Sequence, residues 1–103
     1  MDYAVSWSPA ALEDVDAIAE YISRDSPAYA RAVVNKLLTA AANLSRFPAR
    51  GRVVPELDDA NIRECFVYSY RLIYRIQDHM VLVAAVIHGR CLLEPFVEQI
   101  TDA

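Results

Sequence analysis

Residues 70–76 read YRLIYRI, followed by QDH at 77–79 and MVLVAAVIHGR at 80–90. In the first segment the even-numbered positions hold Tyr, Leu, Tyr and Ile, whereas the odd-numbered positions hold Arg, Ile and Arg. This period of two is typical of a half-buried β-strand. The short polar triplet Gln77-Asp78-His79 predicts a turn that folds the chain back on itself. The sequence therefore predicts a β-hairpin around which the remaining elements are arranged.

The returning strand is apolar at every position from Val81 to Ile87. A strand that is apolar on both faces needs a packed layer on each face. Helices earlier in the chain can supply one layer, but the sequence shows no second helical layer. We therefore expect another polypeptide to complete the cover over this strand.

Two helices are expected before the hairpin. Ser8-Pro9 and Ser26-Pro27 each combine an N-cap residue with a proline at the first helical position. Apolar residues then recur at steps of three and four. The first helix should end near Arg24-Asp25 and the second before Pro48, which gives an antiparallel helical hairpin.

Shorter strands complete the expected order. Residues 3–7 and 62–68 read as strands, while residues 53–57 are at best an edge segment because they contain Pro55. The tail, residues 92–103, offers no more than one short amphipathic turn. These elements predict an α+β fold in the order β-α-α-β-β-β, forming a single domain over residues 1–103.

Composition argues against several classes of function. The formal charge of −4 and the pI of about 5.0 make direct nucleic-acid binding an unfavourable hypothesis, although six of the nine arginines lie between Arg46 and Arg75. No apolar run is long enough to span a bilayer and no signal-peptide pattern is present, so we expect a soluble cytoplasmic protein. Cys65 and Cys91 lack disulfide or metal-site spacing, and we expect no metal and no other cofactor.

A series of short motifs occurs in order along the chain: Trp7-Ser8-Pro9, Tyr21-Ile22, Phe47-Pro48, Gly51-Arg52, Tyr70-Arg71-Leu72-Ile73-Tyr74 and Val86-Ile87-His88-Gly89-Arg90. Together they resemble the ParE/RelE superfamily of bacterial toxins, over about residues 3–91. The resemblance implies a helical hairpin packed on a small antiparallel sheet, and the toxin role in a type II toxin–antitoxin module. It also implies an antitoxin whose carboxy-terminal segment wraps the toxin, which would supply the missing cover over residues 81–87.

The superfamily includes two classes of target. RelE-like members are ribosome-dependent messenger-RNA endonucleases, whereas ParE-like members poison DNA gyrase and have no recognised nuclease centre. RNA cleavage needs a base, an acid and cations that stabilise the phosphorane. Arg71 and Arg90 match arginine positions of the RelE-like nucleases and could hold a phosphate. His88 has a suitable intrinsic pKa for the acid or base.

Other parts of the nuclease pattern are missing. RelE-like enzymes use lysines on the strand before Tyr70, where this chain has Arg63 and Glu64, and a tail tyrosine, where it has Pro95 and Phe96. The candidate residues also have structural interpretations. His88 fits a strand-end histidine with a local hydrogen bond. The two arginines fit surface residues paired with an acid; the acids available are Glu56, Glu64 and Glu94.

The sequence thus predicts a ParE-like toxin that acts by binding DNA gyrase, with Arg71 and Arg90 as target contacts and without chemistry of its own. One alternative is a RelE-like messenger-RNA endoribonuclease that uses Arg71, His88 and Arg90. Another is a non-toxic remnant that still binds an antitoxin.

The antitoxin is the expected stable partner. We expect an amphipathic antitoxin helix to contact apolar positions on the second helix and on the last strand. The candidate contacts are Val33, Leu37, Val83 and Ala85.

Overall fold

The predicted hairpin forms the centre of a five-stranded sheet in the computed structural model, which describes residues 2–102. Its strands, β4 (Tyr70–Gln77) and β5 (Met80–His88), are joined by a turn in which Asp78 has a positive φ of 56°. The other elements are β1 (Ala4–Trp7), α1 (Pro9–Ser23), α2 (Pro27–Asn43), β2 (Arg52–Val53), β3 (Ile62–Val67) and α3 (Val97–Asp102). The α+β prediction is confirmed, with the strands in the order β1-β5-β4-β3-β2.

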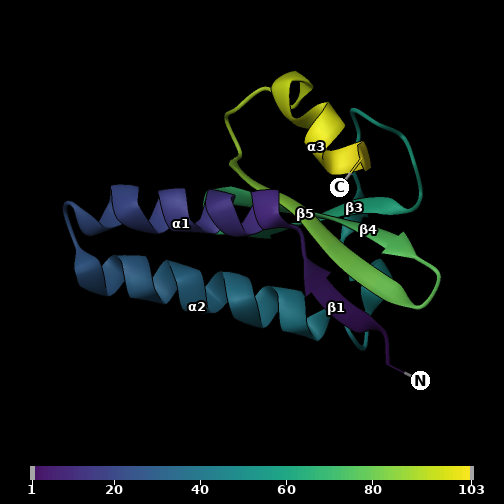
Figure 1. Ribbon diagram of the computed structural model, residues 1–103, viewed down its shortest axis with the longest axis horizontal. Coiled ribbons are helices and arrows are strands. Elements are labelled where there is room, and N and C mark those ends of the chain that lie inside the picture. The colour runs from purple at the N-terminus through teal and green to yellow at the C-terminus, as the bar shows by residue number, and fades with distance from the viewer. Residues whose placement is uncertain (1, 103) are drawn as a thin grey trace.

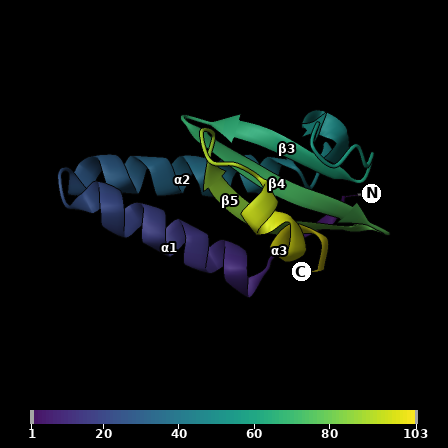
Figure 2. The same ribbon diagram turned by 90° about the horizontal axis from the view of Figure 1, so that it is seen from above.

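Both helices of the N-terminal hairpin begin as the sequence predicts. The Ser8 hydroxyl accepts a hydrogen bond from the Ala11 N–H at 3.0 Å, and the Ser26 hydroxyl accepts one from the Tyr29 N–H at 3.1 Å. A proline follows each cap, where the missing N–H costs nothing. The two helices run antiparallel, and their far end extends beyond the sheet (Figures 1 and 2).

The sheet has a packed core on each face. On one face, α1 and α2 bury Leu37 and Leu44 against the Leu72 and Tyr74 side chains of β4. On the other, the tail buries Leu93 and Ile100 against Ile73 of β4 and against Ala85 and Ile87 of β5. Figure 1 shows α3 on the side of the sheet opposite α2.

This second core corrects the expectation that another polypeptide must complete the cover over β5. The chain's own tail supplies that layer, and both Ile100 and Ala85 are fully buried. This layer could not be predicted from the sequence, because α3 has only six residues, too few to display a helical period. The apolar sequence of β5 is therefore no evidence for a partner.

The sheet is mixed rather than antiparallel, which is a second correction. β1 pairs in parallel with β5, and Ala4 lies opposite Met80. A parallel pair needs a long connection, and here the helical hairpin and three strands provide it. The remaining pairs are antiparallel, and β2 is a two-residue edge strand beside β3.

A β-bulge at Ala84 ties the sheet to both helical layers. Ile73 pairs with Ala85 and Tyr74 pairs with Val83, so Ala84 has no opposite residue. Its carbonyl accepts hydrogen bonds from the Ser8 hydroxyl at 3.3 Å and from Gln99 Nε2 at 3.1 Å.

None of the helices within residues 2–102 is both long and apolar enough to cross a bilayer.

Candidate functional site

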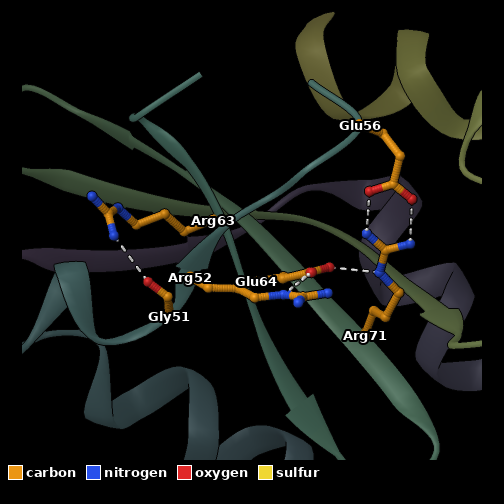
Figure 3. A network of polar contacts seen from close by, with 6 residues as sticks. All are labelled: Gly51, Arg52, Glu56, Arg63, Glu64 and Arg71. Carbon is orange, nitrogen blue, oxygen red and sulfur yellow. Dashed lines mark hydrogen bonds and ion pairs between the residues drawn. The ribbon is translucent and has the colours of Figure 1, made fainter. Parts of the chain in front are cut away.

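A network of charged side chains lies on the tail-facing side of β3 and β4 (Figure 3). Arg71 Nε donates to Glu64 Oε1 at 2.5 Å, while its two terminal nitrogens donate to the two Glu56 carboxylate oxygens at 2.9 Å each. Arg52 Nε donates to the second Glu64 oxygen at 2.7 Å. Glu64 thus joins two arginines, and Arg71 joins two glutamates.

Strand register brings these residues together. Phe66 lies opposite Arg71 and Glu64 lies opposite Ile73, so the Glu64 and Arg71 side chains are diagonal neighbours on one face. Arg52 of β2 lies opposite Glu64 from the other side. This approach requires glycine at the preceding position, because a Cβ on Gly51 would lie 2.5 Å from the Glu64 carbonyl oxygen.

A second set of contacts fixes the loop before β2. Arg63 donates to the carbonyls of Gly51 and Ala60, each at 3.0 Å. The buried Tyr74 hydroxyl donates to the Pro48 carbonyl at 2.7 Å and accepts from the Gly51 N–H at 3.0 Å. Burial raises the pKa of Tyr74 to about 12, so this hydroxyl stays protonated near neutral pH.

Arg71 is the most deeply buried cation of the network. Its side chain is 6 % exposed, compared with 0 % for Glu64 and 45 % for Glu56. The hydrogen bonds that Arg71 donates to Glu56 and Glu64 raise the pKa of Arg71 above its ordinary value, and those that Glu56 accepts lower the pKa of Glu56. The guanidinium is therefore permanently charged and held by two carboxylates of its own chain.

His88 and Arg90 do not join Arg71. Arg71 lies opposite Ile87, so His88 is on the other face of the sheet, where its ring packs edge-on against Tyr70 with centroids 5.5 Å apart. β5 ends at His88, which places the exposed Arg90 in the following turn and outside the strand. The Arg90 N–H donates to His88 Nδ1 at 3.1 Å. This agrees with the interpretation of His88 as a strand-end histidine that makes a local hydrogen bond. Arg71, His88 and Arg90 do not assemble into one acid–base centre.

The four residues predicted to contact an antitoxin are core residues. Val33, Leu37, Val83 and Ala85 each have 0 % of their surface exposed within this chain. Their spacing correctly marked apolar faces, but α2 and β5 turn these faces towards the interior. A partner cannot reach them unless the fold opens.

Sequence reasoning missed a polar contact between α1 and the tail. The Asp14 carboxylate accepts from the Val86 N–H at 3.0 Å and from Gln99 Nε2 at 2.9 Å. Partial burial raises the pKa of Asp14, and the two hydrogen bonds oppose this shift. The Ala84 bulge that brings these groups together leaves no signal in an all-apolar run.

The cysteines and acids form no metal centre. Cys65 and Cys91 are free thiols, and burial raises the pKa of Cys65. Across residues 2–102, no group of three or more His, Cys, Asp or Glu side chains is placed to hold a metal ion.

Comparisons with known proteins agree with this architecture. Residues 5–92 match the family described as the ParE toxin of the type II toxin–antitoxin system parDE. The Caulobacter vibrioides protein named Toxin RelE2 is 36% identical over 86 residues, which cover 82% of this chain and 93% of that protein.

Solved structures share the fold. The chromosomal ParDE toxin–antitoxin system of P. aeruginosa contains a chain that matches with a TM-score of 0.69 and 17% identity, covering 84% of this chain and 95% of that one. The RelBE2 toxin–antitoxin complex of Mycobacterium tuberculosis matches with a TM-score of 0.57 and 28% identity, covering 85% and 92%. The YoeB dimer of Staphylococcus aureus matches with a TM-score of 0.58 and 16% identity, and the match covers 85% of this chain and 98% of that one. Because the family match spans most of its length, the chain belongs to the ParE toxin family and is the toxin of a type II toxin–antitoxin system.

Proposed function

We propose that this toxin acts by binding its target, that the target is DNA gyrase, and that a cognate antitoxin neutralises it. The state of Arg71 is the observation that carries the proposal. In a phosphate-cleaving site this guanidinium would have to meet the substrate, whereas here each of its three nitrogens donates a hydrogen bond to Glu56 or Glu64. His88, the candidate acid or base, faces Tyr70 on the other side of the sheet.

The antitoxin partnership is supported by the relatives. Two of the structural matches are described as a ParDE toxin–antitoxin system and a RelBE2 toxin–antitoxin complex. Since the predicted contacts Val33, Leu37, Val83 and Ala85 are buried, we propose that the antitoxin binds exposed surface instead. Gyrase and ribosomes both work in the cytoplasm, which is where this function requires the chain to act.

The test compares the two target classes with the purified chain. We expect it to inhibit supercoiling of relaxed plasmid by gyrase and to leave messenger RNA intact on translating ribosomes. Arg90→Ala, which removes an exposed cation, should weaken gyrase inhibition without loss of folding. Ribosome-dependent transcript cleavage with uninhibited gyrase would contradict the proposal.

The RelE-like endoribonuclease is the second candidate, because the 36% identical relative is named RelE2. In that case Arg71 must leave Glu56 to reach a phosphate. Cleavage that disappears in His88→Ala and in Arg71→Lys, both checked for folding by circular dichroism, would establish this candidate. Expression of the chain that harms neither process would instead favour the non-toxic remnant.

A further inference from the structure

Positive and negative charges are segregated in this acidic chain. Residues 26–55 contain Arg31, Lys36, Arg46, Arg50 and Arg52 and no Asp or Glu. By contrast, α1 and the tail from residue 91 contain acids and no Lys or Arg. The net charge of −4 therefore conceals a basic region made by α2, the loop after it and β2.

A groove opens within this basic region, between α2 and the outer edge of β3. It has a volume of about 320 Å³, and Lys36, Thr39 and Asn43 of α2 line one side, with Cys65–Tyr68 opposite and Arg50 at the rim. The two charged residues of the lining are both cations, and no carboxylate is among them. Its floor includes the apolar side chains of Ala40 and Val67.

The edge of β3 beside this groove is open. β2 pairs only with Arg63 and Glu64, which leaves residues 65–67 beyond its reach. The Ile62 carbonyl accepts from the Val54 N–H, so it points to this outer edge. Because backbone direction alternates along a strand, the N–H and C=O of Glu64 and Phe66 point to the same edge. Phe66 thus offers a backbone donor and acceptor for an added strand.

The side chains along this edge differ between the two faces. Phe66 is 56 % exposed, its side chain lies on the same face as that of Arg71, and the Arg52 guanidinium carbon is 5.0 Å from the centroid of its ring. Lys36, a residue of α2, lies on the side of the sheet that α2 covers. A strand added here would direct alternate residues towards Lys36 and towards Phe66.

We propose that the groove between α2 and β3 binds an extended acidic peptide segment, which pairs as a strand with the outer edge of β3. Carboxylates of the segment meet Lys36 and Arg50, and apolar residues on its other face pack on Phe66. An open strand edge is complementary to a peptide backbone and not to a sugar–phosphate backbone. A short segment also needs only the local cations, whereas a long phosphodiester strand would meet the acidic remainder of the surface. The inference deepens the proposed function and rests on it, since the antitoxin is the partner that supplies the segment.

The experiment uses the full-length chain and the antitoxin encoded beside it, with affinity measured by isothermal titration. We expect the double variant Lys36→Glu/Arg50→Glu to bind at least about tenfold more weakly, equivalent to about 1.4 kcal/mol. Arg31→Glu/Arg46→Glu is the matched control, because it also exchanges two exposed cations for two anions, at positions outside the groove lining. It should bind within about twofold of wild type.

Two further variants test strand pairing without changing charge. Phe66→Pro removes the outward N–H and the ring, whereas Phe66→Ala removes the ring alone. We expect Phe66→Pro to bind more weakly than Phe66→Ala. We also expect antitoxin to slow hydrogen exchange at the amide of Phe66, and circular dichroism establishes that each variant is folded.

The possible failures are distinguishable. If wild type binds the antitoxin but Lys36→Glu/Arg50→Glu binds equally well, the groove assignment is wrong and the antitoxin proposal stands. If wild type forms no complex, both are wrong. A fluorescein-labelled single strand of about 12 nucleotides, as DNA and as RNA, is the competing probe. Tight, salt-sensitive binding of it that Lys36→Glu/Arg50→Glu abolishes would reassign the groove to nucleic acid.

Discussion

Arg71 is a strand residue whose side chain points into the layer between the sheet and the tail, where an unpaired charge would be costly. Glu64 is more deeply buried than Arg71, and each satisfies the charge of the other. Such a pair contributes little net stability compared with an apolar pair, but removing one partner leaves a buried charge uncompensated. The network therefore constrains which substitutions the site tolerates.

Replacing the two glutamates should have unequal effects. We expect Glu64→Ala to lower the free energy of unfolding by about 3 kcal/mol, because both Arg71 and Arg52 lose their shared partner. Glu56 is 45% exposed, so solvent can replace it, and Glu56→Ala should cost about 1 kcal/mol or less. Urea unfolding measures both. Glu20→Ala, which breaks an exposed pair with Arg24, is the control. Equal losses for Glu64→Ala and Glu20→Ala would contradict the buried network.

Lowering the pH should weaken the ion pair between Glu56 and Arg71. The Arg71 hydrogen bonds lower the pKa of Glu56 below its ordinary 4.5, so the native state binds fewer protons than the unfolded state. The stabilisation is complete above pH 4.5 and is lost as the pH falls through the folded-state pKa. Urea midpoints of wild type and Glu56→Gln should therefore converge as the pH falls below 4.5.

Asp14 provides a control of opposite sign for this pH dependence. Burial raises its pKa above 3.8, so its ionised form opposes folding at neutral pH. Wild type should gain stability relative to Asp14→Asn as the pH falls, while it loses stability relative to Glu56→Gln. Parallel pH profiles for the two variants would contradict both assignments.

The Tyr74 hydroxyl makes a separate prediction. In Tyr74→Phe the Gly51 N–H and the Pro48 carbonyl each lose a partner inside the protein. We expect a loss of about 1–3 kcal/mol in the free energy of unfolding. Tyr21→Phe, at a ring that is 70% exposed, should change it by less than about 0.5 kcal/mol. A Tyr74→Phe protein as stable as Tyr21→Phe would show that the loop does not depend on this hydroxyl.

Residue roles could be anticipated only as alternatives. The acids predicted as partners of Arg71 included Glu56 and Glu64, and both are, but Glu94 is not. That choice depends on the register of β3 and β4 and on the path of residues 54–61, which sequence periodicity does not specify. His88 was correctly given a local hydrogen bond as one interpretation, because a lone histidine at a strand end has backbone groups nearby.

At the scale of elements, the longest segments were the most predictable. The Ser-Pro caps located α1 and α2, and alternation located β4. The short elements were harder: the two-residue β2 and the six-residue α3 lack a measurable period. The parallel pairing of β1 was also missed, since partner choice between distant strands is a property of topology and not of local sequence.

The tail helix offers a direct test of the second core. Ile100 is fully buried against the face formed by Ile73, Ala85 and Ile87. Ile100→Ala should lower the free energy of unfolding by about 2–5 kcal/mol through lost burial and a residual cavity. Leu92→Ala, at a side chain that is 79% exposed, should have little effect. A neutral Ile100→Ala would mean that α3 does not seal the sheet in solution.

At the scale of the whole molecule, two features separate folding from partner binding. The chain covers both faces of its sheet, so no apolar face of β5 remains for a partner to complete. The surfaces that remain open include a basic groove and a short strand edge. An antitoxin that binds there would add stability by mass action and would not act as a missing piece of the core.

This separation predicts that the chain folds alone. Purified without antitoxin, it should unfold in urea in one cooperative transition, with coincident near-ultraviolet and far-ultraviolet circular dichroism, and should bind no ANS in the native state. Adding the antitoxin at about 100 times its Kd should then raise the free energy of unfolding by about 2.7 kcal/mol without restoring any lost structure. A chain that binds ANS and lacks near-ultraviolet dichroism until antitoxin is added would instead mean that β5 and the tail require the partner, because only an unsealed second core exposes that surface.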